Sequence, residues 1–437
     1  MMKRKALFTA LVGTFIEYYD YALYGFSAGL IAAHFFPRND PTVSLIQTFG
    51  VFALGSCAKP LGALIFGRLG DVYGRRVSLR ISMLGIAIST TIIGLVPDYE
   101  TWGWISPLIL LLCRIMQGML VAGEYDGVVI YMLEHITKKR ACFGSSLVGL
   151  ASMIGIAIAS FAATLAQQPH LPDYYWRIPF LLGGVMGSVI FYFRQYLDET
   201  PEFKAYKAKL PLPIDANFKR FLSRNGRGLL CTLLVCGAVG GCYHFYIIFW
   251  GIYLSTILQI LSPNQAAFAM SVSVFTLAFF SPVAGLAADR VGIQKTLTTA
   301  ALGLILMAIL NSIMVWLKIM PLAVMMMTSG VMAFFMVPGH AYLINLYGIG
   351  ERYRGLSLGH TLGSMIFSGS APFLSLYIWQ KTVWSLAPIV YFMILVGLMP
   401  LALAIGRQRL AVKHFSGPLR KHYDWQVERA RGIEPPS

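Results

Sequence analysis

Long apolar runs separated by short polar segments dominate this chain. Twelve of these runs reach the roughly 20 residues that a helix needs to cross a bilayer. Because a bilayer core holds no water for backbone polar groups, each run is predicted to be a helix. The predicted spans cover residues 6–36, 43–67, 77–96, 106–134, 143–166, 178–197, 228–258, 266–288, 296–317, 321–347, 355–380 and 384–406.

One long polar interruption divides these spans into six and six. We therefore predict an N-terminal bundle at 1–197, a cytoplasmic linker at 198–227, a C-terminal bundle at 228–406 and a cytoplasmic tail at 407–437. An internal repeat supports the division. GRLGDVYGRR, from Gly67, and GLAADRVGIQ, from Gly285, share G-x-x-x-D-x-x-G after the second span of each half. The fold class predicted is an all-α membrane protein of twelve transmembrane helices in two pseudo-symmetric six-helix bundles, with the substrate site between them.

Basic residues are distributed unevenly about the spans. With a cytoplasmic N-terminus, 29 of the 35 Lys and Arg residues fall on or near cytoplasmic segments, and four fall on the opposite side. This imbalance predicts that both termini are cytoplasmic. It also explains the net charge of +16 without nucleic acid as a partner.

The composition excludes several classes of protein. With 57% hydrophobic and 12% charged residues, the chain is far more apolar than a soluble domain. Its six cysteines have no C-x-x-C spacing, so neither a disulfide framework nor a metal site is predicted. The sequence has no phosphate-binding loop and no nucleophile elbow, so we predict neither an ATP-driven pump nor an enzyme.

Several ionisable residues lie inside the predicted spans. Each would cost about 2.5–3.5 kcal/mol at the bilayer centre if it were unpaired. They must therefore face one another or a wet cavity. They are Glu17, Asp20, Lys59, Arg114, Glu124 and Asp126.

Spacing within the spans predicts a proton switch. Glu17 and Asp20 share a helix face with Tyr24, and Gln117 lies one turn after Arg114. An arginine beside Asp20 would keep it ionised, and movement of that arginine would let it take a proton. Glu17 or Glu124 is the alternative titrating group, and the structural alternative is that these residues only tie helices together.

The same charges bear on the substrate. Lys59 and Arg114 would give a cavity fixed positive charge, which favours a carboxylate-bearing substrate. The alternative for Lys59 is that it snorkels or pairs with an acid. For Asp126 two functions are open: it could recognise a substrate amine, or it could add a second titrating group. The structural alternative is that it only packs between neighbouring helices.

Several stretches together resemble the major facilitator superfamily, and within it the metabolite:proton symporter family. They are GTFIEYYDYALYG, KPLGALIFGRLGDVYGRR, CRIMQGMLVAGEYDG, WRIPFLLGG, LDETPEF and, more loosely, ERYRGLSLGHTLGS. The sequence departs from the family pattern at Thr14, Lys59 and Asp126, and Ile293 and Gln294 replace the basic pair of the second repeat.

The resemblance implies a cytoplasmic gate in the first repeat. In this gate Asp71 lies near the N-terminus of the eleventh span, where the helix dipole stabilises a negative charge. The residues assigned to it are Gly67, Asp71, Gly74, Arg75 and Arg76.

The resemblance also implies the function. We expect a proton-coupled symporter that imports a small carboxylate-bearing metabolite by alternating access, as a monomer among the lipids of a bacterial inner membrane. The proton is the coupling ion, and no cofactor is expected. The alternatives are import of a zwitterionic osmolyte or amino acid, import of a larger organic acid such as an iron chelator, or a membrane receptor that transports nothing.

Overall fold

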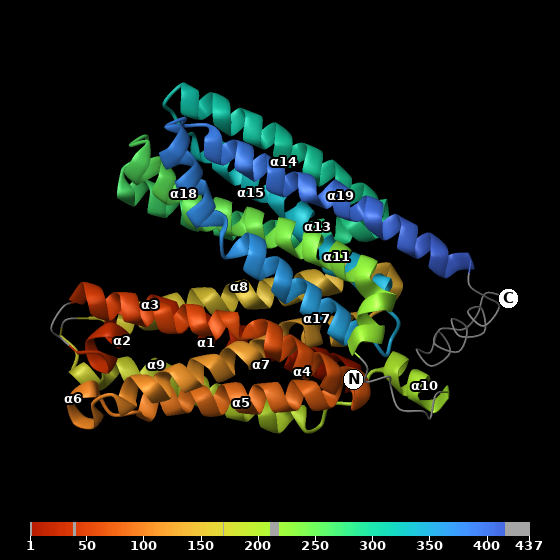
Figure 1. The fold of residues 1–437 in the computed structure, drawn as a ribbon, viewed down its shortest axis with the longest axis horizontal. Coiled ribbons are helices and arrows are strands. Elements are labelled where there is room, and N and C mark those ends of the chain that lie inside the picture. Colours follow the sequence, from red (N-terminus) through yellow and green to blue (C-terminus); the bar gives the residue numbers. More distant parts are fainter. Residues whose placement is uncertain (1, 38–40, 169, 210–217, 416–437) are drawn as a thin grey trace.

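A computed structural model describes residues 2–37, 41–168, 170–209 and 218–415 of the protein. Within these residues every regular element is a helix. Figure 1 shows two bundles, one formed by α1 to α9 and the other by α11 to α19. The start of α1, the short α10 (Pro201–Lys209) and the end of α19 lie toward one end of the molecule, which we call the linker end. The opposite end is called the outer end.

The N-terminal bundle contains six long helical spans, two of which are broken. The first breaks at Ser27, and the second breaks at Ala58, just before Lys59. Pro60, the second residue of α4, has no N–H to donate to the preceding turn, which explains the second break. The helices are α1 (Met2–Phe26), α2 (Ala28–Phe35), α3 (Pro41–Cys57), α4 (Lys59–Val72), α5 (Arg75–Leu95), α6 (Tyr99–Trp102), α7 (Ile105–His135), α8 (Ala141–Ala166) and α9 (Arg177–Arg194).

The C-terminal bundle is less regular. Single π-helical turns, which are often found at functional sites, occur at His244–Phe249, Tyr253–Ile257 and Ser364–Ser368. Pro338 separates α15 from α16 and places His340 in the first turn of α16. The helices are α11 (Phe218–Tyr243), α12 (Trp250–Ile252), α13 (Pro263–Val291), α14 (Ile293–Trp316), α15 (Leu322–Met336), α16 (Pro338–Leu343), α17 (Arg352–Gly363), α18 (Ala371–Thr382) and α19 (Ala387–Phe415).

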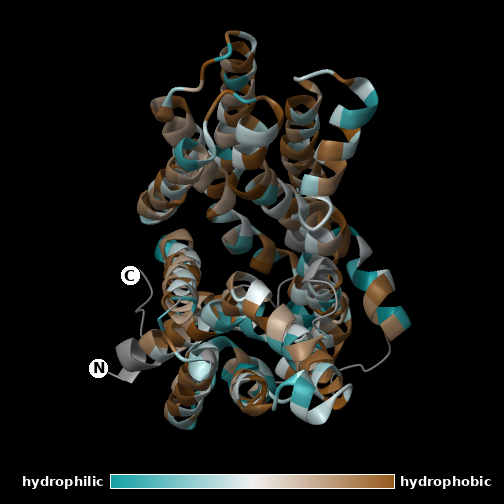
Figure 2. Ribbon diagram, turned by 90° about the vertical axis from the view of Figure 1, so that its left-hand side faces the viewer, coloured by the Kyte–Doolittle hydropathy of each residue, from teal (hydrophilic) through white to brown (hydrophobic). Residues whose placement is uncertain are grey.

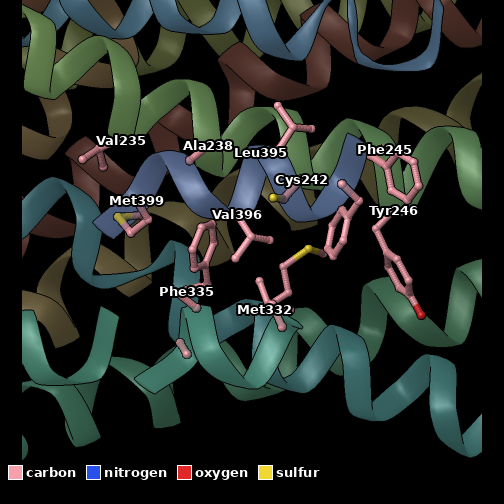
Figure 3. Packing of buried hydrophobic residues seen from close by; sticks show 14 of the residues in the cluster. Val235, Ala238, Cys242, Phe245, Tyr246, Met332, Phe335, Leu395, Val396 and Met399 are labelled. Carbon is pink, nitrogen blue, oxygen red and sulfur yellow. The ribbon is translucent and has the colours of Figure 1, made fainter. Parts of the chain in front are cut away.

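The largest hydrophobic core lies within the C-terminal bundle. Figure 3 shows Cys242 and Phe245 beside Met332, Val396 and neighbouring side chains. These residues come from α11 and its π-helical continuation, from α15 and from α19. Because the core joins helices distant in sequence, the bundle can move as one body.

The outer surface is apolar, as a bilayer requires. Hydrophobic residues occur along the helices of both bundles in Figure 2, and large ones such as Phe275, Phe279 and Trp316 are more than two-thirds exposed. Among the described residues, eleven helical stretches are long and apolar enough to cross a membrane. The predicted first span forms α1 and α2 but falls outside this set. Its two acids and its tyrosines lower its hydropathy.

Two helices extend well beyond the predicted spans. The predicted seventh span starts at 228, whereas α11 begins at Phe218, because its polar first turns continue the helix beyond the apolar run. The helix α19 likewise continues past 406 to Phe415. Residues 210–217 of the predicted linker and 416–437 of the predicted tail lie outside the described part of the chain.

Candidate substrate and gating site

Asp20 lies at the start of a buried hydrogen-bonded chain. Its Oδ1 accepts a hydrogen bond from the Thr90 hydroxyl at 2.5 Å, and its Oδ2 accepts one from Nε2 of Gln117 at 2.8 Å. Oε1 of Gln117 in turn accepts a hydrogen bond from Arg114 at 2.8 Å. The structure therefore brings Asp20, Gln117 and Arg114 together, but it places Gln117 between the acid and the base.

Aromatic rings surround the Arg114 guanidinium. Its central carbon lies 4.2 Å from the ring centre of Tyr24, 5.2 Å from that of Phe52 and 5.9 Å from that of Tyr21. The residue is 3% exposed, and its buried Nε has no hydrogen-bond partner. Over the described ranges no carboxylate forms a salt bridge with Arg114. The cation is thus held by aromatic faces and one neutral amide.

Lys59 and Glu17 occupy the same region of the N-terminal bundle. Nζ of Lys59 lies 4.5 Å from the ring centre of Tyr21. Glu17 is 1% exposed, and both of its carboxylate oxygens are buried without a hydrogen-bond partner. A buried carboxylate without partners is costly when charged, and that cost is much smaller when it carries a proton.

Glu124 differs from Glu17 because it is fully paired. Its two oxygens bind the Arg194 guanidinium in bidentate fashion, and Ser82 donates a further hydrogen bond at 2.6 Å. Gly13 makes room for this pair, since a Cβ at that position would overlap the Arg194 side chain. Charge counting along the sequence assigned Arg194 to a cytoplasmic end, yet the residue is fully buried.

Asp126 links the two bundles. Its Oδ1 lies 2.8 Å from Nδ1 of His360, on α17, and 4.0 Å from Nε2 of His340, on α16. The Tyr125 ring packs against both histidines. Asp126 therefore faces the C-terminal bundle and not the lipid.

Asp71 lies at the linker end, directly against the N-terminus of α17. Its carboxylate accepts hydrogen bonds from the backbone N–H groups of Tyr353 at 3.0 Å and Arg354 at 3.1 Å, and from Nε of Arg354 at 3.3 Å. These N–H groups belong to the first turn of α17, which supplies no acceptors of its own for them and where a negative charge is stabilised. The contact joins α4 of one bundle to α17 of the other.

Arg75 extends this contact into a buried network. Its guanidinium binds both oxygens of Glu134 at 3.2 and 3.0 Å and donates to the carbonyl of Ile349 at 2.7 Å. Arg352 also donates to Glu134 at 2.7 Å and to Glu202, on α10, at the same distance. Sequence reasoning missed Glu134, Glu202 and Arg352, because their partners are distant in sequence.

Glu199 supports the first turn of α5. It accepts hydrogen bonds from the backbone N–H groups of Arg75 at 3.1 Å and Arg76 at 3.2 Å. Burial raises the pKa of Glu199 above its usual range, although its hydrogen bond with the Thr200 backbone opposes that shift. Arg76 contributes its backbone here, and its side chain lines a surface pocket beside α10.

The second repeat makes the same contact in the other direction. Asp289, at the end of α13, accepts hydrogen bonds from the backbone N–H groups of Cys142 at 2.8 Å and Phe143 at 2.9 Å. Those residues begin α8 of the N-terminal bundle. Each bundle therefore presents a motif aspartate to a helix N-terminus of the other bundle.

The repeated glycines also have matching roles. A Cβ on Gly67 would lie 2.8 Å from Cα of Arg354, and one on Gly285 would lie 2.8 Å from the carbonyl oxygen of Cys142. Both positions thus let a helix N-terminus approach closely. Gly74 and Gly292 both adopt positive φ, at 109° and 105°, where a side chain would be strained.

The sequence and the fold both match known transporters. Residues 10–258 match the Major Facilitator Superfamily. The Inner membrane metabolite transport protein YhjE of Escherichia coli (strain K12) is 30% identical over 436 residues, covering 93% of this chain and 94% of that protein. The Proline/betaine transporter of the same organism is 29% identical over 412 residues, covering 91% of this chain and 82% of that protein.

Solved structures show the same fold at lower identity. The proton:xylose symporter XylE bound to 6-bromo-6-deoxy-D-glucose has a TM-score of 0.71 and 15% identity, covering 94% of this chain and 96% of that one. The human organic anion transporter MFSD10 has a TM-score of 0.66 and 16% identity, and the match covers 93% of this chain and 100% of that one.

The comparisons agree with the predicted fold of a membrane transporter and with the prediction that the chain is not an enzyme. The family match spans more than half of the residues, and the bacterial relatives align over nearly the whole length. The chain, with two bundles joined by reciprocal motif contacts, is therefore a secondary transporter of the Major Facilitator Superfamily.

Proposed function

We propose that the protein imports a small carboxylate-bearing metabolite together with protons, across the inner membrane of a bacterium. The bacterial relatives are transporters of metabolites or of proline and betaine, by their names. The linker end would be cytoplasmic, in keeping with the distribution of basic residues. One chain contains both bundles and both motif contacts between them, which suits a transporter that works as a monomer.

The observation that carries the proposal is the unbalanced positive charge of Arg114. Its buried guanidinium has no carboxylate partner among the described residues and is held by aromatic rings and Gln117. A planar guanidinium is well suited to bind a carboxylate in bidentate fashion. A substrate carboxylate would supply the charge that this cation lacks, while Lys59 would add positive potential nearby.

The hydrogen-bonded chain from Arg114 to Asp20 offers a coupling mechanism. When a substrate carboxylate takes the Arg114 donor, the side chain of Gln117 loses its position and Asp20 loses one of its donors. An acid that loses a hydrogen bond to its charged form takes up a proton more readily. Glu17, with no partner for either oxygen, is a second proton-carrying group in this mechanism. Glu124 is held by Arg194 and serves to fix the bundle.

Alternating access would then break the contacts at the linker end. Asp71 and Asp289 each leave a helix N-terminus of the opposite bundle when this end opens. In this proposal the structure represents the state closed toward the cytoplasm, because the linker end holds both motif contacts. Membrane lipid, the substrate and protons are the partners that this cycle needs.

A zwitterion is the second candidate substrate, favoured by the names of the proline/betaine relatives. Such a molecule keeps the carboxylate for Arg114 and adds a cation. Asp126 lies on the same helix as Arg114 and, with His360, lies between the bundles. It would be the acid that faces that cation.

The test is uptake into proteoliposomes with an imposed inward proton gradient. A panel of labelled monocarboxylates, dicarboxylates, proline and betaine is compared with and without the gradient. We expect gradient-driven accumulation of at least one carboxylate-bearing compound. A failure of every compound to drive proton entry would contradict the proposal and favour a receptor.

The matched variants are Arg114→Gln and Lys318→Gln, the latter altering an exposed cation at the outer end. A hydrogen bond to a charged group contributes about 1.5–3 kcal/mol, so Arg114→Gln is expected to weaken substrate binding by about 10- to 150-fold. Lys318→Gln should leave binding unchanged. An unchanged affinity in Arg114→Gln would remove this residue from the site.

A further inference from the structure

Three potential metal ligands meet between helices that are far apart in sequence. They are Cys236 on α11, His340 on α16 and His360 on α17. Their ligand atoms all lie within 4.8 Å of one another. Around a tetrahedral zinc ion with bonds of about 2.0–2.3 Å, ligand atoms lie roughly 3.4–3.6 Å apart, so shifts of about 1 Å would close the site.

The histidine His340 gives an independent indication of a ligand. Its Nε2 is buried and has no hydrogen-bond partner, and the nearest carboxylate oxygen, Oδ1 of Asp126, is 4.0 Å away. Leaving a buried polar nitrogen unpaired is unfavourable. A metal ion in the space shared with Cys236 and His360 would satisfy this nitrogen.

Asp126 provides the outer support that metal-binding histidines usually have. Its Oδ1 lies 2.8 Å from Nδ1 of His360. A carboxylate at this place fixes the orientation of the ring and strengthens the imidazole as a ligand. The Tyr125 ring packs at 5.4 Å from His340 and 5.8 Å from His360, measured between ring centres, and so restricts both.

We propose that Cys236, His340 and His360 form a binding site for a divalent first-row transition-metal ion, supported by Asp126 from the opposite bundle. One thiolate and two imidazoles are ligands that select zinc-like ions over magnesium or calcium. Three protein ligands leave a fourth position open. His360 is 24% exposed at its side chain, so water or a substrate carboxylate can reach this position.

The site would also sense the contact between the bundles. Its three ligands belong to the C-terminal bundle, whereas Asp126 belongs to the N-terminal bundle. Separation of the bundles at this level removes the support of Asp126 and lowers the affinity for metal. This inference goes beyond the proposed uptake of a metabolite and does not depend on it.

The experiment is a titration of purified, tag-free protein with Co²⁺, followed by its absorption spectrum. Co²⁺ bound by a thiolate gives a charge-transfer band in the near ultraviolet, and tetrahedral Co²⁺ absorbs in the visible range. We expect both signals to saturate at one ion per chain and to be displaced by Zn²⁺. The absence of a saturable thiolate band in the native protein would overturn the proposal.

The variants separate the site from other cysteines and histidines. Cys236→Ser should abolish the charge-transfer band, while Cys242→Ser, at another buried cysteine of α11, should keep it. His340→Gln and Asp126→Asn should each weaken binding by about 10–100-fold or more, while His34→Gln, near the outer end, should not. A band that persists in Cys236→Ser, or equal affinity in His340→Gln and His34→Gln, would refute the assignment.

Discussion

The substitution Asp71→Asn tests the contact that closes the linker end. Asp71 is fully buried and accepts the backbone N–H groups of Tyr353 and Arg354 at 3.0 and 3.1 Å. Asparagine has nearly the same shape but keeps only one accepting oxygen. Its amide N–H₂ group would face a backbone N–H, and no charge would remain to meet the positive end of α17.

The size of the effect follows from these lost interactions. A hydrogen bond to a charged group contributes about 1.5–3 kcal/mol, and a charge at a helix N-terminus contributes about 0.3–2 kcal/mol. Water solvates the same groups once the contact opens, so we expect a net loss of about 2–3 kcal/mol in the closed state. At about 1.4 kcal/mol per factor of ten, the open state becomes roughly 30- to 140-fold more populated.

Cys142 is a natural reporter of this opening. It is fully buried at the N-terminus of α8, where its backbone N–H donates to Asp289 in the second contact. Its alkylation by a membrane-permeant maleimide can be followed by mass spectrometry, and its rate rises in proportion to the open population. Cys242, buried in the core of the C-terminal bundle, should stay unmodified and so reports on unfolding.

The control is Asp98→Asn, which removes an acid at the outer end that binds Arg177 at 2.6 Å. This variant should leave the Cys142 rate near that of the native protein. The reasoning is refuted if Asp71→Asn changes the rate by less than twofold, or if Cys142 and Cys242 become reactive together.

Three further predictions concern the interior and the second contact. Glu124→Gln leaves Arg194 buried without a charge partner and should destabilise the protein by about 3–5 kcal/mol, measured as a lower thermal transition in detergent. Gly285→Ala forces a Cβ to within 2.8 Å of the Cys142 carbonyl and should speed Cys142 alkylation. Asp20→Asn should abolish proton-driven accumulation while exchange of substrate across the membrane persists.

Each of these three has its own contrary outcome. For Glu124→Gln the control is Glu100→Gln, which changes an exposed acid. Equal thermal transitions in the two variants would contradict the predicted loss of stability from breaking the buried Glu124–Arg194 pair. An unchanged alkylation rate in Gly285→Ala would mean that the contact accommodates the added methyl group without opening. Unimpaired uphill uptake by Asp20→Asn would remove this acid from coupling.

Much of the fold was predictable because membrane helices depend on local sequence. Long apolar runs must be helices in a bilayer, and their number follows from the pattern of apolar and polar residues along the chain. The breaks inside them, such as those at Ser27 and Ala58, were not predicted. Pro60 and Pro338 were visible, but proline is tolerated within other helices here, such as α13 at Pro282 and α19 at Pro400.

The site was predictable only in part, because pairing depends on distances between helices. The intramembrane charges had to have partners, yet nothing in the sequence showed that Glu124 takes Arg194 or that Gln117 separates Asp20 from Arg114. Cysteine spacing carried no information about the neighbours of Cys236 for the same reason. The Sγ atom of Cys236 lies near ring nitrogens of two histidines that come more than a hundred residues later, and no local sequence motif indicates this.

The two motif contacts are alike in design but unequal in strength. Asp71 is reinforced by Arg75, which binds Glu134 of its own bundle and donates across the bundle boundary to the carbonyl of Ile349. The second repeat has Ile293 and Gln294 where the first has its basic pair, and Asp289 forms its contact with two backbone groups. Most of the energy that keeps the linker end closed therefore resides in the first repeat. For this reason the removal of charge at Asp71, and not at Asp289, is the perturbation that should move the whole equilibrium.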